Sequence, residues 1–298
     1  MSFETDVKPV LDGRCVVCHG CYDAPCQLLL SSHEGAARGA SKQAVYDTTR
    51  LTEMEPTRLG VDAHGTEAWR AKGFFSVLES AGAAGSVPLL ARMLALGAAH
   101  PPAPRERLPA SVPLDVDRTL SCADAIEFDA YARDNPHGGM PYGTAPLADE
   151  ELRILASWVA QGAPAPAAAP PPARDADVDV WEAFLNGPSL KERIAARYLY
   201  EHWFVAHLVF EGRPAGPFFR VVRSRTAPGE PIDEIATVRP FDDPGATFWY
   251  RLRPIDETIV HKTHIVYALG PARLARLRQL FLETDWQPTR FPSYVPQE

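Results

Sequence analysis

The sequence predicts an α+β protein built from a mainly helical N-terminal domain and a smaller C-terminal domain of helices and antiparallel strands. Three observations lead to this prediction. Apolar residues recur at helical spacing in the first half of the chain. A segment rich in proline and alanine then interrupts it. Beyond residue 218, apolar and polar residues alternate with a period of two, which is typical of strands.

The interruption marks the expected domain boundary. Residues 163–174 are almost entirely Pro and Ala, and proline at this density favours an extended polyproline II spacer that does not pack. We therefore expect a first domain over residues 1–162, a linker over 163–174 and a second domain over 175–298.

A short motif near the N-terminus carries the strongest chemical signal. Cys15-Val16-Val17-Cys18-His19 is a CxxCH pentad, and this spacing is typical of covalent haem attachment. Each thiol can form a thioether to one vinyl group of a single porphyrin, and the adjacent imidazole can bind the iron. An isolated pentad can also be a redox dithiol or half of a zinc site.

A second motif favours haem over these alternatives. Met140 and Pro141 lie between glycines in a segment suited to present a thioether to the iron, and a helix is expected over residues 149–159. The order CxxCH, Met-Pro and closing helix resembles a class I cytochrome c domain, here with additional helices and loops inserted. The expected axial ligands are His19 and Met140, with His137 as the alternative to Met140.

The charge, hydropathy and cysteine content of the chain exclude some classes of binding partner and indicate its compartment. The chain of 298 residues has a net charge of −8, which argues against nucleic acid and against electrostatic docking on anionic lipid head groups. No apolar run approaches the roughly 20 residues of a membrane span. Of the five cysteines, Cys21, Cys26 and Cys122 remain outside the pentad, so that one disulfide can form and its pairing is open. Haem c and a disulfide both indicate an exported, oxidising compartment.

The second domain is expected to begin with helices and continue into strands. Ser189 and Glu192 have capping-box spacing, so a long helix should follow, with an apolar stripe that reaches Leu208. The expected strands cover residues 218–226, 247–253 and 258–267. Pro271 should open a last helix.

Two groups of polar residues in this domain have more than one interpretation. The histidines at 202, 207, 261 and 264 lack the spacing of helix-borne metal ligands, so structural or pocket roles are favoured. Several arginines recur among the strands. They form either a solvated face with ion pairs or a carboxylate-binding group. These arginines are Arg220, Arg223, Arg225, Arg239, Arg251 and Arg253.

The segment Arg14–Leu28 resembles the signature of the bacterial fatty acid cis/trans isomerases, which are periplasmic c-type haem enzymes. Later segments that resemble the same family cover residues 52–59, 139–143, 196–202, 223–233 and 259–264. Members of the family are much longer, with an export signal before and an extension after this region. We therefore expect this chain to be a shortened version whose signal peptide lies outside it.

The resemblance implies a function. The expected activity is haem-dependent cis-to-trans isomerisation of unsaturated fatty acids of membrane lipids, by transient electron withdrawal from the double bond. The residues carried over are Cys15, Cys18 and His19 for haem c, and no catalytic side chain is assigned besides the haem iron itself. The alternative is an electron-transfer c-type cytochrome fused to a partner-binding module. A haem sensor, with ligand exchange at Met140, is a third interpretation.

Overall fold

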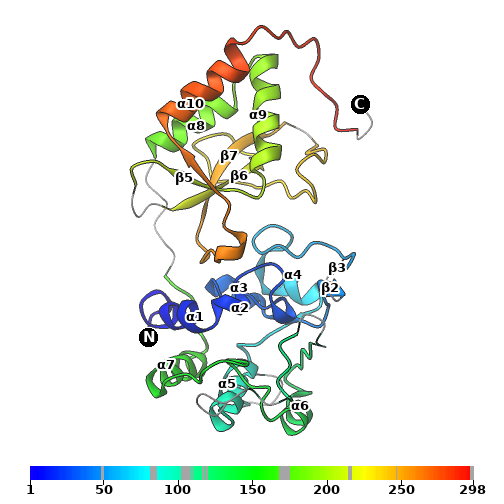
Figure 1. The fold of residues 1–298 in the computed structure, drawn as a ribbon, viewed down its shortest axis with the longest axis vertical. Coiled ribbons are helices and arrows are strands. Elements are labelled where there is room, and N and C mark those ends of the chain that lie inside the picture. The colour runs from blue at the N-terminus through cyan, green and yellow to red at the C-terminus, as the bar shows by residue number, and fades with distance from the viewer. Residues whose placement is uncertain are drawn as a thin grey trace. The chain divides into compact units, whose positions relative to one another are not determined.

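The structure is a computed structural model, and its chain forms two compact units (Figure 1). The first unit comprises Met1–Ala168 and Glu257–His261, and the second comprises Ala169–Asp256 and Lys262–Glu298. The described residues are 1–47, 50–80, 86–101, 108, 110–115, 118, 120–167, 175–213, 217–245 and 247–295. Residues 168–174 of the expected linker lie outside them. Among the described residues, no helix is both long and apolar enough to cross a membrane.

The first unit is mainly helical, as expected. Two short antiparallel pairs of strands accompany the helices: β1 (Ala40–Ser41) with β4 (Phe74–Phe75), and β2 (Tyr46–Asp47) with β3 (Arg50–Leu51). The helices are a π-helical turn η1 (Phe3–Val7), α1 (Lys8–Arg14), α2 (Val16–His19), the 3-10 turn η2 (Pro25–Gln27), α3 (His33–Arg38), α4 (Gly65–Ala71), α5 (Leu89–Ala99), α6 (Phe128–Asp134) and α7 (Asp149–Ala160).

The first and last helical segments of this unit share one hydrophobic core. Phe3 and Leu11 are buried in the same cluster as Leu155 and Trp158 of α7, and the rings of Phe3 and Trp158 lie 5.6 Å apart. The predicted closing helix is thereby confirmed as α7. Its first turn is capped because the backbone N–H of Ala148 donates to Glu151 Oε2 at 2.8 Å.

The second unit is a four-stranded mixed sheet packed with three helices (Figure 1). The sheet order is β7 (Trp249–Ile255), β6 (Phe218–Ser224), β5 (His207–Phe210) and β8 (Val266–Leu269). The helices are α8 (Ala176–Leu185), α9 (Leu190–Trp203) and α10 (Pro271–Arg278), which continues as the π-helical turn η4 (Gln279–Glu283). The α+β class is therefore confirmed.

Three expectations for this unit are corrected by the structure. The long helix ends at Trp203, and His207–Phe210 form β5 instead, because their burial alternates with a period of two. The sheet is not purely antiparallel, since β5 pairs in parallel with β8. The expected strand over 258–267 is replaced by irregular backbone and the 3-10 turn η3 (His261–Thr263), and the strand β8 starts only at Val266.

The start of that segment has other hydrogen-bond partners, which explains the last correction. The backbone N–H of Thr258 donates to the Ser31 carbonyl oxygen at 3.1 Å, and the Thr258 hydroxyl donates to Asp12 Oδ1 at 2.7 Å. These bonds replace a strand ladder and attach residues 257–261 to the first unit.

Candidate functional site

The CxxCH pentad lies where α1 ends and α2 begins. Cys15 is the residue between the two helices, with its side chain half-buried, and Cys18 is exposed one turn later in α2. Both thiols are free of disulfides. Burial is the main reason why the pKa of Cys15 is raised to about 11, so its thiol is protonated at neutral pH.

The His19 side chain is held in place by one backbone hydrogen bond. Its ring is buried, and Nδ1 lies 3.0 Å from the carbonyl oxygen of Leu28. Burial lowers the pKa of His19, and the Leu28 hydrogen bond opposes this effect, so the imidazole is neutral near pH 7. A neutral ring that donates from Nδ1 carries its lone pair on Nε2, and a lone pair of this kind is what a histidine ligand gives to a metal. The two free thiols and this nitrogen fit the donor set that haem c requires.

Gly20, directly after the pentad, is covered by the segment that returns from the second half of the sequence. A Cβ atom at Gly20 would lie 2.5 Å from Cγ1 of Val260 and 2.6 Å from the carbonyl oxygen of Val16. Only glycine fits here, so Val260 packs against the backbone at the end of α2.

Arg14 connects the pentad to the segment that follows Met140. Its Nη2 donates to the carbonyl oxygens of Ala145 and Pro146 at 2.8 and 2.6 Å, and its Nε lies 3.5 Å from Glu151 Oε2 of α7. The residue before Cys15 therefore holds the chain between Met140 and α7.

Met140 lies on a backbone that is pressed against α5. Its N–H donates to the Met93 carbonyl oxygen at 2.9 Å, and a Cβ at Gly97 would approach the Met140 carbonyl oxygen to 2.2 Å. The Met140 side chain is half-buried and packs, as does Cys15, against the core of the first unit. The pentad and Met140 thus border one hydrophobic core.

The alternative ligand His137 lies beside a small cavity next to Met140. Its ring is 6.0 Å from that of His100, and both rings line the cavity together with Pro141. His137 is thus the second candidate ligand, placed beside the Met140–Pro141 segment.

A disulfide joins Cys26 to Cys122, with their Cα atoms 5.5 Å apart. This settles the pairing that the sequence left open. Cys21 is buried and lies outside the disulfide.

The histidines of the second unit are distributed differently from the sequence-based expectation. His207 is on β5 and His264 precedes β8, and their Nδ1 atoms lie 3.1 Å apart. His202 stacks on Tyr198, one turn earlier in α9, with ring centroids 3.9 Å apart. Within the described part of the chain, no group of three or more His, Cys, Asp or Glu side chains could hold a metal ion.

Most of the strand arginines serve the structure of the second unit. Arg251 is buried and its Nε donates to Glu182 Oε2 at 2.9 Å, while Arg253 pairs with Glu234 at 2.6 Å. Arg223 is 1% exposed, so it belongs to the interior and not to a solvated face. The ion-pair interpretation holds for Arg251 and Arg253, although the first of these pairs is buried.

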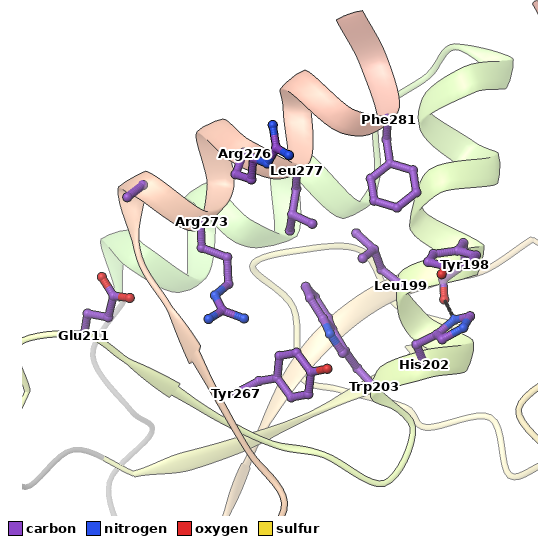
Figure 2. Close-up of a pocket in the computed structure, with 11 residues that line it drawn as sticks. Tyr198, Leu199, His202, Trp203, Glu211, Tyr267, Arg273, Arg276, Leu277 and Phe281 are labelled. Atoms are coloured by element: carbon purple, nitrogen blue, oxygen red, sulfur yellow. Dashed lines mark hydrogen bonds between the residues drawn. The ribbon is translucent and has the colours of Figure 1, made fainter. Parts of the chain in front are cut away.

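A pocket of about 520 Å³ lies between α9 and α10 of the second unit (Figure 2). Its wall is mainly apolar and aromatic, with Arg273 pointing from α10 toward Tyr267. No local pattern in the sequence indicates this pocket, because its residues come from α9, β8, α10, the turn η4 and Glu211, the residue after β5. The lining residues are Tyr198, Leu199, His202, Trp203, Glu211, Tyr267, Ala272, Arg273, Arg276, Leu277 and Phe281.

Comparison with protein-family models places most of the chain in a known family. The family model described as fatty acid cis/trans isomerase (CTI) matches residues 54–298, which is all but the first 53 residues. The pentad precedes the matched range, whereas Met140 and the pocket lie inside it. No curated protein and no solved structure matches the chain. The chain belongs to the fatty acid cis/trans isomerase family, and this membership implies the isomerisation of fatty acid double bonds.

Proposed function

We propose that this chain is an exported, haem-dependent isomerase that converts cis double bonds of membrane-derived fatty acids to trans. The haem c would be attached through Cys15 and Cys18, and His19 and Met140 would hold its iron. The observation that carries the proposal is the His19 ring, whose Nδ1 is held by Leu28 beside two free thiols, in a chain of the isomerase family.

The side chains of the first unit have definite roles in this proposal. The Leu28 carbonyl oxygen fixes the tautomer and orientation of His19, so that the lone pair of Nε2 would serve as the iron ligand. Arg14 holds the segment after Met140, and the close contact of Gly97 with the Met140 backbone fixes that residue on α5. When bound, the haem supplies an oxidising centre that can withdraw electron density transiently from a double bond.

The disulfide supports the proposed location. Disulfides persist in exported proteins and are rare in reducing compartments, so the Cys26–Cys122 bond favours a periplasmic enzyme.

Electron transfer is the competing function, and one observation favours it. Val17 is 76% exposed and Cys18 is exposed, so one side of the attachment site lies at the surface of the first unit. An exposed haem edge is what an electron-transfer partner requires.

The proposal is tested by incubating haem-loaded protein with cis-9-hexadecenoic acid, without reductant or nucleotide, and analysing the products by gas chromatography. We expect trans-9-hexadecenoic acid, with the double bond in its original position. Cys15→Ser and Cys18→Ser should each reduce the yield, and the double variant should abolish it. Cys21→Ala, outside the pentad, is the control. Reduction of a partner cytochrome without any trans product would establish electron transfer instead.

A further inference from the structure

We propose that the pocket between α9 and α10 binds one long-chain fatty acid, with its carboxylate at Arg273 and its tail against the aromatic wall. The inference depends on the proposed function for the identity of the ligand. It adds a location for the substrate, in the second unit and on named residues.

The size and wall of the pocket fit an acyl chain. Its volume of about 520 Å³ is within the range of about 300–1,000 Å³ typical of small-molecule sites. Leu199 and Trp203 are buried side chains of α9 that line the pocket, and Leu277 and Phe281 line it from the opposite helix (Figure 2). Such a wall binds methylene groups without requiring a hydrogen-bonding partner.

Arg273 provides the only cationic group that Figure 2 shows directed at the centre of the pocket. Its guanidinium lies 5.5 Å from the ring centroid of Tyr267. In the described part of the chain it makes no hydrogen bond or ion pair, whereas Arg276 donates to Gln279. A guanidinium beside an apolar pocket is suited to the head group of an anionic amphiphile, because its planar donors match a carboxylate.

The acidic residue of the wall lies against the start of α10. Glu211, the residue after β5, directs its carboxylate at Gly270, where a Cβ atom would lie 2.0 Å from Glu211 Oε2. Gly270 is the N-cap of α10, and the start of a helix favours negative charge. This position leaves Arg273 available for a ligand.

Calorimetric titration with saturated fatty acids of increasing length tests whether the apolar wall binds the acyl tail. Affinity should rise by about fourfold for each methylene buried until the pocket is full. Ala272→Trp, which places an indole in the wall, should block binding. Ala275→Trp is the matched control, since Ala275 is exposed on the same helix and does not line the pocket.

The head-group contact is tested with Arg273→Gln. This variant should weaken the binding of a free acid by about fivefold, the magnitude of a solvent-exposed ion pair, and leave the binding of the methyl ester unchanged. Arg290→Gln, an exposed arginine outside the pocket, is the control. In a separate titration, phosphatidylcholine vesicles replace the free acid. Binding to vesicles with no binding of the free acid would overturn the carboxylate assignment.

The same titrations are made on haem-loaded and haem-free protein, because acyl binding in this pocket needs no iron. Binding that is insensitive to both Ala272→Trp and Arg273→Gln would overturn the inference even if the enzyme isomerises. Specific binding by a protein that never isomerises would uphold the pocket and contradict the proposed function.

Discussion

Val260 packs directly on Gly20, the residue after the pentad, so that a Cβ atom at position 20 would lie 2.5 Å from Val260 Cγ1. This contact joins residues 240 positions apart in the sequence, both within the first unit. Together with the hydrogen bonds of Thr258, it holds residues 257–261 in the first unit instead of in the sheet. The backbone at the end of α2 and the Val260 side chain form one packed surface beside His19.

Gly20→Ala should therefore disturb the pentad. The added methyl meets both Val260 and the Val16 carbonyl oxygen, and we expect a loss of about 1–3 kcal/mol in the free energy of unfolding, together with a lower haem content after export. Urea denaturation and the haemochrome assay measure the two effects. Gly13→Ala is the control, because nothing lies within 4 Å of a Cβ there, and it should raise helix stability by up to about 1 kcal/mol. If the two variants have the same free energy of unfolding and the same haem content, the contact between Gly20 and Val260 does not matter for the pentad.

Gly97→Ala should displace Met140 from α5. A methyl group at this position would approach the Met140 carbonyl oxygen to 2.2 Å, and a displaced loop cannot hold a thioether at the iron. The near-infrared absorption band of Met-ligated ferric haem should weaken in Gly97→Ala and vanish in Met140→Ala. Ala98→Leu, at the exposed next position of the helix, should keep it. If the spectrum of Met140→Ala equals that of the wild type, Met140 is excluded and the assignment moves to His137 or another group.

Loss of the Cys26–Cys122 disulfide should destabilise the first unit. The bond links residues 96 positions apart, and removal of a native disulfide typically costs about 2–5 kcal/mol. Cys26→Ser, Cys122→Ser and the double variant should lose similar amounts, because each removes the same cross-link. Denaturant unfolding with and without a reductant measures the loss, and reduction should affect only the wild type. Additive losses in the double variant would show that the cysteines act independently.

The His207–His264 pair should make the second unit sensitive to acid. Burial, followed by the charges of His264 and Arg220, lowers the pKa of His207 below its unfolded value of about 6.5. Near pH 6.5 and below, His207 therefore binds a proton more readily in the unfolded chain than in the folded chain. The free energy of unfolding should consequently be unaffected above about pH 7.5 and fall as the pH drops through about 6.5.

The measurement is urea unfolding between pH 5 and 8, for the wild type and for His207→Gln. The variant should show a shallower pH dependence than the wild type. His64→Gln, which removes an exposed histidine of the first unit, should leave the slope unchanged. If the free energy of unfolding of His207→Gln depends on pH as steeply as that of the wild type, His207 is not the group responsible.

Local signals in the sequence were sufficient to predict where several helices begin. The capping box at Ser189 and Glu192 is confirmed, with the Ser189 hydroxyl accepting from the Glu192 N–H at 3.2 Å, and Pro271 does open the last helix. Such caps depend only on neighbouring residues, which the sequence displays directly.

Features that depend on distant contacts were not predictable. The parallel pairing of β5 with β8 joins His207 to Val266, and the short strand β5 was mistaken for the end of a helix because Leu208 falls on the stripe of α9. The pocket around Arg273 exists only after α10 packs opposite α9, and the net charge of −8 gave no indication of a local cation there.

The measurement that tests the central claim most directly is the yield of trans fatty acid per covalently bound haem. Preparations of the whole chain with different haem contents would be compared, with haem counted on the Cys15–His19 peptide by mass spectrometry. We predict an initial rate that is proportional to the haem content and vanishes in Cys15→Ser/Cys18→Ser. Equal activity in haem-free protein, or fully loaded protein that leaves the cis double bond unchanged, would contradict the account.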